Sequence, residues 1–156
     1  MNENNEYPVR LREIRETPVC SLRRIVTNLQ QDLPPMINSL LEDITAMGGV
    51  YAGPPIVLYH DEVFKTEQAD VEVAWPVLNK DLANKNLPAL VAATLMHVGP
   101  YDGIASSYDA VYAWINQNGY RARAPRREII YNDPQNIPQE QLTIEIVIPV
   151  EKALIT

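Results

Sequence analysis

Four aromatic residues are spaced so that they could form a binding surface for a flat or cationic molecule. Tyr108 and Tyr112 are four residues apart, so they share one side of a helix if this segment is helical, and Tyr101 precedes it. Trp75 belongs to an apolar segment elsewhere in the chain. Ring faces attract cations and stack on flat molecules, so all four are candidate ligand-binding residues. The same spacing is typical of a packed helix face, and both interpretations stay open.

Glu128 is the acidic residue that could complete such a site. It lies in a segment rich in β-branched residues, and an internal repeat aligns it with the apolar Ile56. A carboxylate on an inner face is costly unless it is paired or solvated, and a bound cation would supply the partner. The alternative is a salt bridge with Arg126 or Arg127. Glu128 is a candidate ligand-binding residue and also a candidate catalytic one, because a carboxylate can orient a water molecule.

The usual catalytic and metal-binding patterns are absent from the sequence. It contains no GxSxG, HExxH, CxxC, GxGxxG or P-loop motif. Cys20 is the single cysteine, so we expect a buried small side chain rather than a disulfide or a zinc site. His60 and His97 are not spaced as metal ligands. We therefore expect no metal and no cofactor.

The net charge of −7 limits the partners that the chain can have. Nucleic-acid affinity depends on basic surface, so we expect no nucleic-acid binding by this chain alone. No apolar run approaches the roughly 18 residues of a membrane span, and the first residues lack a signal-peptide pattern, so we expect a cytoplasmic protein without a membrane partner. One local basic run is interpreted as a solvated strand edge: Arg121, Arg123, Arg126 and Arg127.

An internal repeat organises the chain. Val71–Val77 (VEVAWPV) resembles Ile144–Val150 (IEIVIPV), and Tyr59–Asp61 (YHD) resembles Tyr131–Asp133 (YND), at offsets of 73 and 72. Two independent matches at nearly one offset argue against chance, and a repeat of this length is one supersecondary unit. We therefore predict a single domain over residues 1–156 that is built from two repeats.

Each repeat, about 7–78 and about 87–151, is predicted to be strand, helix, strand, strand. The fold class is therefore α+β. Residues 79–86 are polar and without periodicity, so they are interpreted as a connector. The predicted elements are strands over 9–14, 56–59 and 71–75 with a helix from about Asp32 to Gly48, and strands over 90–96, 128–131 and 142–148 with a helix from Ile104 to about Asn118.

Five short segments, taken in their order and spacing, carry a family resemblance: Gly99–Tyr101, Trp114–Gly119, Arg127–Ile129, Asn132–Pro134 and Ile148–Val150. With them the chain resembles the GyrI-like family, whose fold also forms the effector-binding domain of many AraC-type and MerR-type multidrug regulators. The family often has a tyrosine two residues after the strand glutamate, where this chain has Ile130, followed by Tyr131. No helix-turn-helix segment precedes Tyr7, so we expect a stand-alone member.

The resemblance implies duplicated units of the SHS2 type that form a concave, mainly antiparallel sheet, with two helices lining a cleft and a buried glutamate that meets cationic, aromatic compounds. Neighbouring side chains of a strand point to opposite faces of a sheet. Glu145 alternates with the apolar Ile144 and Ile146, and the repeat places Glu72 likewise. We therefore predict that Glu128 points into the cleft and that Glu72 and Glu145 face solvent.

Three functions are compatible with these residues. The first is binding of amphipathic, often cationic aromatic small molecules in the cleft, for sensing or for sequestration in drug or toxin resistance. The second, which the resemblance suggests, is hydrolysis of electrophilic, cyclopropane-bearing natural products in the same cleft. The third is a protein partner, as in inhibition of a topoisomerase.

Overall fold

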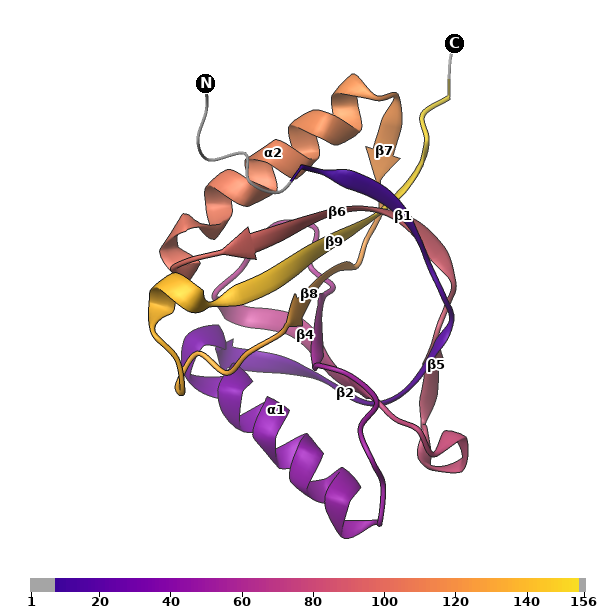
Figure 1. Ribbon diagram of the computed structural model, residues 1–156, viewed down its shortest axis with the longest axis vertical. Coiled ribbons are helices and arrows are strands. Elements are labelled where there is room, and N and C mark those ends of the chain that lie inside the picture. The colour runs from indigo at the N-terminus through magenta and orange to yellow at the C-terminus, as the bar shows by residue number, and fades with distance from the viewer. Residues whose placement is uncertain (1–7, 155–156) are drawn as a thin grey trace.

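A curled antiparallel sheet with two helices on one of its faces makes up the computed structural model, which describes residues 8–154 (Figure 1). Three short 3-10 helices connect some of the strands: η1 (Lys80–Leu82), η2 (Tyr101–Gly103) and η3 (Gln139–Gln141). The helices and strands are α1 (Leu29–Ala46), α2 (Ile104–Gln117), β1 (Arg10–Ile14), β2 (Thr17–Asn28), β3 (Ile56–Tyr59), β4 (Glu67–Pro76), β5 (Lys85–Leu87), β6 (Leu90–Val98), β7 (Tyr120–Ala122), β8 (Arg126–Ile130) and β9 (Thr143–Lys152).

The strand order shows two equivalent halves. It runs β1-β6-β9-β8-β3-β4-β2-β5, and β7 pairs with β9. In the middle, β6-β9-β8 and β3-β4-β2 mirror each other across the contact between β8 and β3. Each half contains the strand before a helix and two strands after it. This order confirms the predicted α+β fold of duplicated strand-helix-strand-strand units with a concave, mainly antiparallel sheet.

The predicted first strand of the first repeat was wrong. Residues 9–14 do contribute a strand, β1, but it pairs with β6 of the second half. The strand equivalent to β6 is β2, which precedes α1 and pairs with β4. Most of β2 is a sheet edge, because β5 covers only Thr17–Val19, and edge strands tolerate charged residues such as Arg23 and Arg24. The prediction that residues 79–86 form only a connector was also partly wrong, because Lys85 and Asn86 belong to β5.

Helix α1 begins earlier than predicted, at Leu29. The side chain of Asn28 accepts a hydrogen bond from the backbone N–H of Gln31, and the carboxylate of Asp32 accepts one from the N–H of Asn28. This reciprocal cap satisfies two backbone donors at the start of the helix. Pro34 and Pro35 therefore lie in the second turn instead of the first.

Both helices end at the predicted glycines. Gly48, after α1, has φ +80°, and Gly119, after α2, has φ +75°. L side chains rarely adopt this left-handed backbone, so glycine is favoured at both positions. Among the described residues, neither helix is long and apolar enough to cross a membrane.

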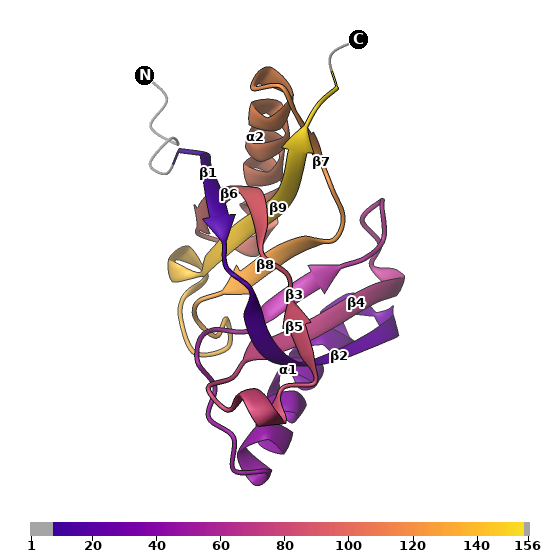
Figure 2. The ribbon, with the colours of Figure 1, turned by 90° about the vertical axis from the view of Figure 1, so that its right-hand side faces the viewer.

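Each helix covers its own half of the sheet. The core under α1 joins Ile44 of the helix to Val71 and Val73 of β4, and the core under α2 joins Val111 of the helix to Ile146 of β9. The two cores flank the central strands β3 and β8, where the halves meet. The sheet face that carries the helices is called the helix side, and the face inside the half-barrel is called the inner face. Figure 2 shows β1 leading into β2 along the open side of the half-barrel.

Candidate functional site

Glu128 lies on the helix side, at the centre of the sheet. In β8 and β3, Glu128 is paired with Val57, and Arg126 is paired with Tyr59. Residues paired in an antiparallel ladder share a face, so these four side chains point toward the helices. Ile56 faces the opposite way, so the alignment of Glu128 with Ile56 was wrong by one residue. The inference drawn from it holds, because Val57 is also an apolar, buried residue.

Three tyrosine hydroxyls surround the carboxylate of Glu128. Tyr108 of α2 donates to Oε2 at 2.5 Å, Tyr59 of β3 donates to Oε1 at 3.3 Å, and Tyr101 of η2 donates to Oε1 at 3.4 Å. Glu128 is only 2% exposed. A buried carboxylate without donors would be costly, and these hydroxyls reduce that cost. Glu128 and its three tyrosines are called the Glu128 cluster.

A cation of the chain itself lies against the rings of this cluster. The guanidinium carbon of Arg126 is 4.7 Å from the ring centre of Tyr59 and 5.6 Å from those of Tyr108 and Phe64. Such distances are typical of cation–π contacts. The positive charge also favours ionised Glu128. The cluster therefore has the geometry of a cation site, in which aromatic rings surround a buried carboxylate.

Burial sets the protonation behaviour of the cluster. Removal from water raises the pKa of Glu128, although the tyrosine hydroxyls and Arg126 act in the opposite direction. Burial, followed by the nearby charge of Glu128, raises the pKa of Tyr59, Tyr101 and Tyr108. The three phenols therefore remain protonated donors at neutral pH.

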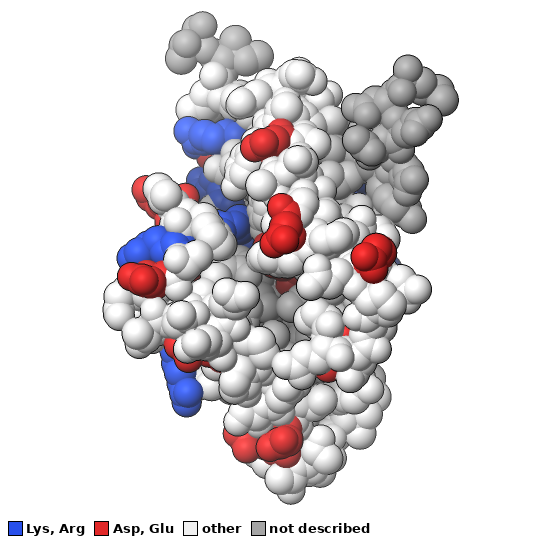
Figure 3. Space-filling model, turned by 90° about the vertical axis from the view of Figure 1, so that its left-hand side faces the viewer, with Lys and Arg blue, Asp and Glu red and all other residues white. Residues whose placement is uncertain are grey.

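Two of the predicted aromatic residues, Tyr101 and Tyr108, are brought directly to Glu128. A third, Tyr112, stacks on Tyr108 with ring centres 6.4 Å apart and is 40% exposed. It extends the aromatic surface from the cluster toward the outside. Figure 3, which looks onto the side where both helices begin, shows that this face is hollowed near its middle.

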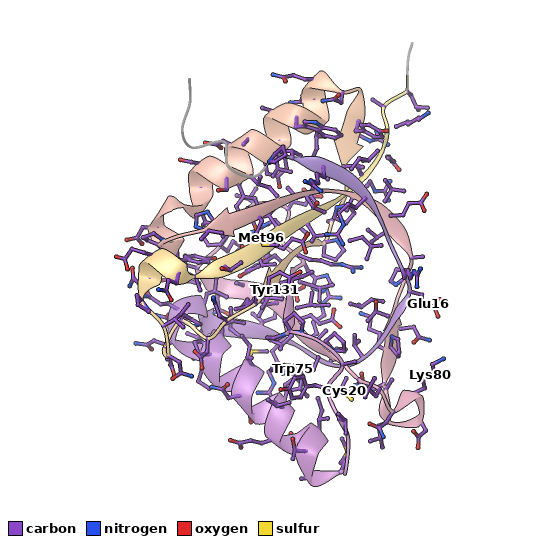
Figure 4. The ribbon with its side chains drawn as sticks, viewed as in Figure 1. Glu16, Cys20, Trp75, Lys80, Met96 and Tyr131 are labelled. Carbon is purple, nitrogen blue, oxygen red and sulfur yellow. The ribbon has the colours of Figure 1, made fainter. Side chains whose placement is uncertain are left out.

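Trp75 lies apart from the Glu128 cluster. Its indole N–H donates to the backbone oxygen of Ile37 in α1 at 2.9 Å, and its ring meets Tyr51 edge-on at 5.5 Å. In Figure 4 it lies against α1, close to Cys20, which is buried as predicted. The structure therefore places Trp75 in the core beneath α1.

The family-related choice between Ile130 and Tyr131 is resolved by strand parity. Ile130 pairs with Ile144 and packs into the core on the helix side. Tyr131 donates its hydroxyl to Glu145 on the inner face, at 2.8 Å. Ile130 therefore stands on the same side as Glu128, and Tyr131 does not.

Sequence reasoning missed Tyr59 as a neighbour of Glu128 and Phe64 as a neighbour of Arg126. Tyr59 belongs to the first repeat, and only the pairing of β3 with β8 brings it to the cluster. The contact could have been predicted by assuming that the two repeats pair with each other through their equivalent strands, β3 and β8. Phe64 lies in the loop between β3 and β4, which has no periodic pattern to indicate where the ring would go.

The prediction that Glu72 and Glu145 face solvent was wrong. Both side chains are buried, at 2% and 4% exposure. The predicted parity is right, because both face away from the Glu128 cluster. The curl of the sheet encloses that face. Burial by itself would raise the pKa of Glu72, but hydrogen bonds from Lys85 (3.0 Å) and His60 (2.9 Å) outweigh it, so the pKa is lowered.

The basic run of β7 and β8 divides into three environments. Arg121 and Arg123 are exposed and pair with Glu151, as expected for a solvated edge. Arg126 lies half-buried against the aromatic rings. Arg127 is 4% exposed, so its assignment to a solvated edge was wrong. Alternation along β8 turns Arg127 to the enclosed inner face.

Comparison with known proteins defines the class of this fold. The sequence model of the GyrI-like small molecule binding domain matches residues 7–151. The chain therefore belongs to the GyrI-like family of small-molecule-binding domains. A comparison with curated proteins found no match.

Two solved structures of EcmrR share this fold. The EcmrR C-terminal domain is 29% identical, with a TM-score of 0.82, and the match covers 95% of this chain and 99% of that one. In the EcmrR–DNA complex the match is 30% identical, with a TM-score of 0.82, and covers 94% of this chain but 58% of the longer EcmrR chain.

Two more distant structures share the fold. A hydrolase from Listeria innocua is 12% identical, with a TM-score of 0.70 and 92% of each chain covered. SAV2435 bound to tetraphenylphosphonium is 15% identical, with a TM-score of 0.58 and 94% of each chain covered.

Proposed function

We propose that this chain binds amphipathic, cationic aromatic small molecules at the Glu128 cluster. The observation that carries the proposal is the guanidinium of Arg126, which lies over the rings of Tyr59 and Tyr108 beside a buried carboxylate. A surface that attracts one delocalised cation has the electrostatics to attract another. The ligand cation takes the place of Arg126, whose long side chain can turn outward to solvent.

Shape and charge are recognised by different groups. Tyr112 and Phe64, both exposed in part, offer ring surface to an aromatic ligand, and this contact depends on shape. Glu128 is held in a low-dielectric environment, so its attraction for a cation is stronger than it would be in water. Neutral molecules of the same shape gain the stacking but not the charge pairing.

The physiological role that we propose is sensing or sequestration of such compounds in the cytoplasm. EcmrR carries the related domain in a chain that forms a complex with DNA, which supports sensing as a use of this fold. The acidic net charge of the present chain favours accumulation of cations near its surface.

A matched ligand pair tests the proposal. The cation (4-hydroxyphenyl)trimethylammonium and the neutral 4-tert-butylphenol have nearly the same shape, and both can be titrated calorimetrically into the wild type and Glu128→Gln. The wild type should prefer the cation by about 1–4 kcal/mol, the Coulomb attraction of two unit charges about 4 Å apart in water or near a protein surface, and Glu128→Gln should lose that preference. Melting temperatures of both proteins control for folding. Equal losses for the two ligands would show that Glu128 is structural.

A second candidate function is hydrolysis of an electrophilic ligand. It is favoured by one contact, the 2.5 Å hydrogen bond between the Tyr108 hydroxyl and a carboxylate whose pKa burial has raised. Such a pair can deliver a proton to a bound ligand or orient a water molecule. Incubation with a cyclopropane-bearing electrophile distinguishes the two functions, because a product that forms with the wild type and not with Glu128→Gln requires catalysis.

A further inference from the structure

Arg127 carries a buried charge on the inner face without an ion pair. It lies in the middle of the sheet, paired with Leu58 on one side and Val147 on the other, and is 4% exposed. Its Nε is buried and has no hydrogen-bond partner, and the guanidinium forms no ion pair with any carboxylate within residues 8–154. Burial lowers the pKa of Arg127, the more distant charge of Glu72 acts in the opposite direction, and a guanidinium remains charged near neutral pH. A buried charge of this kind calls for a partner.

The acidic residues of this face do not supply that partner. Glu72 and Glu145 are buried nearby in β4 and β9, but each is already satisfied by other groups. Their presence also disfavours a multiply charged anion, because like charges repel at close range. The groups that satisfy them are Lys85 and His60 for Glu72, and Tyr131 and Arg12 for Glu145.

A cavity of about 260 Å³ opens beside Arg127. Apart from Arg127, its lining is mainly apolar, and it lies where the β1–β2 junction crosses the open side of the half-barrel (Figure 2). Tyr131, near the middle of the sheet in Figure 4, forms part of its wall. The volume is below that of most drug-sized pockets and suits a single ring or a short aliphatic chain. The lining includes Ile14, Thr17, Ile56, Ile129 and Val147.

We propose that this inner-face cavity is a second binding site, which takes small organic monocarboxylates with their carboxylate on Arg127 and their apolar body against Ile56 and Ile129. Guanidinium and carboxylate match in charge and in bidentate geometry. The site is independent of the Glu128 cluster, because Arg127 and Glu128 are neighbours in β8 and point to opposite faces of the sheet.

Benzoate and benzamide are the probes, since they have the same shape and differ in charge. Both are titrated into ¹⁵N-labelled protein of residues 1–156, and the Nε–Hε signal of Arg127 and the backbone amide of Ile129 are followed by NMR. Benzoate should shift both signals in a saturable way, and benzamide should bind about tenfold or more weakly. Equal responses to the two probes, or no response of the Arg127 signal to benzoate, would overturn the proposal.

Three variants locate the site. Arg127→Met should weaken benzoate binding about tenfold or more while retaining a full thermal unfolding transition, because methionine fills the space without a buried charge. Ala52→Phe places a ring at the cavity wall and should abolish benzoate binding with the Arg127 signal still present. Arg121→Met, at an exposed arginine, is the matched control and should bind benzoate as the wild type does. Unchanged benzoate affinity in Ala52→Phe would refute the site even if Arg127→Met failed to fold.

Discussion

Replacing Tyr108 with phenylalanine removes the shortest of the three hydrogen bonds to Glu128, at 2.5 Å. The acceptor is 2% exposed, so water does not replace the lost hydroxyl freely. A hydrogen bond to a charged group contributes about 1.5–3 kcal/mol, so the free energy of unfolding should fall by about 2 kcal/mol at neutral pH. The melting temperature should fall by about 4–8 °C for a domain of this size. Tyr101→Phe, which removes a 3.4 Å contact, should cost clearly less.

The pH dependence distinguishes this hydrogen bond from a general packing role. The Tyr108 hydroxyl favours ionised Glu128 and so lowers its pKa, and its removal should raise that pKa further. The stability difference between wild type and Tyr108→Phe should therefore be full above the raised pKa of Glu128 and shrink as pH falls through that pKa, where the folded carboxyl group becomes protonated. Chemical denaturation at several pH values measures it. A difference that stays constant with pH, or equal losses in Tyr108→Phe and Tyr101→Phe, would refute the reasoning.

Three further predictions follow from the same geometry. Arg126→Met should bind tetraphenylphosphonium about 3- to 30-fold more tightly by calorimetry, because the substitution removes a cation–π contact that competes with the ligand. Weaker binding would mean that Arg126 helps to hold the ligand. Because the pKa of folded Glu128 is raised, the stability that this group contributes is present below about pH 4 and is lost as pH rises through the folded pKa. Denaturation curves should therefore show that the wild type loses stability relative to Glu128→Gln as pH rises over that range. The opposite trend would contradict the burial argument. Gly119→Ala should cost about 1 kcal/mol in thermal unfolding, from its φ of +75° alone, since no atom lies within 4 Å of the added methyl group.

Three of the central strands, β3, β4 and β9, were predictable from sequence. Residues 56–59, 71–75 and 142–148 carry apolar side chains at strand spacing, and all but Leu142 lie in the strands β3, β4 and β9. The glycines after both helices were predictable for a local reason, since a left-handed residue ends a helix. β2 was not, because an edge strand with polar residues on both faces carries little periodic signal.

The Glu128 cluster was predictable only in part. Tyr101, Tyr108 and Glu128 come from one repeat, and their spacing was sufficient to group them. Tyr59 comes from the other repeat and depends on the pairing of β3 with β8. Alternation assigned Glu72 and Glu145 to the correct face but could not indicate their burial, because the curl of the sheet that encloses them is a tertiary feature.

A crystal structure with (4-bromophenyl)trimethylammonium tests most directly whether the Glu128 cluster is the cation site. Anomalous scattering from bromine fixes the orientation of the ring. The ammonium group should lie within about 6 Å of the ring centre of Tyr59 or Tyr108, with the guanidinium of Arg126 moved away from the Tyr59 ring. A ligand bound beside Trp75 or in the inner-face cavity, with Arg126 still in place over Tyr59, would contradict the account.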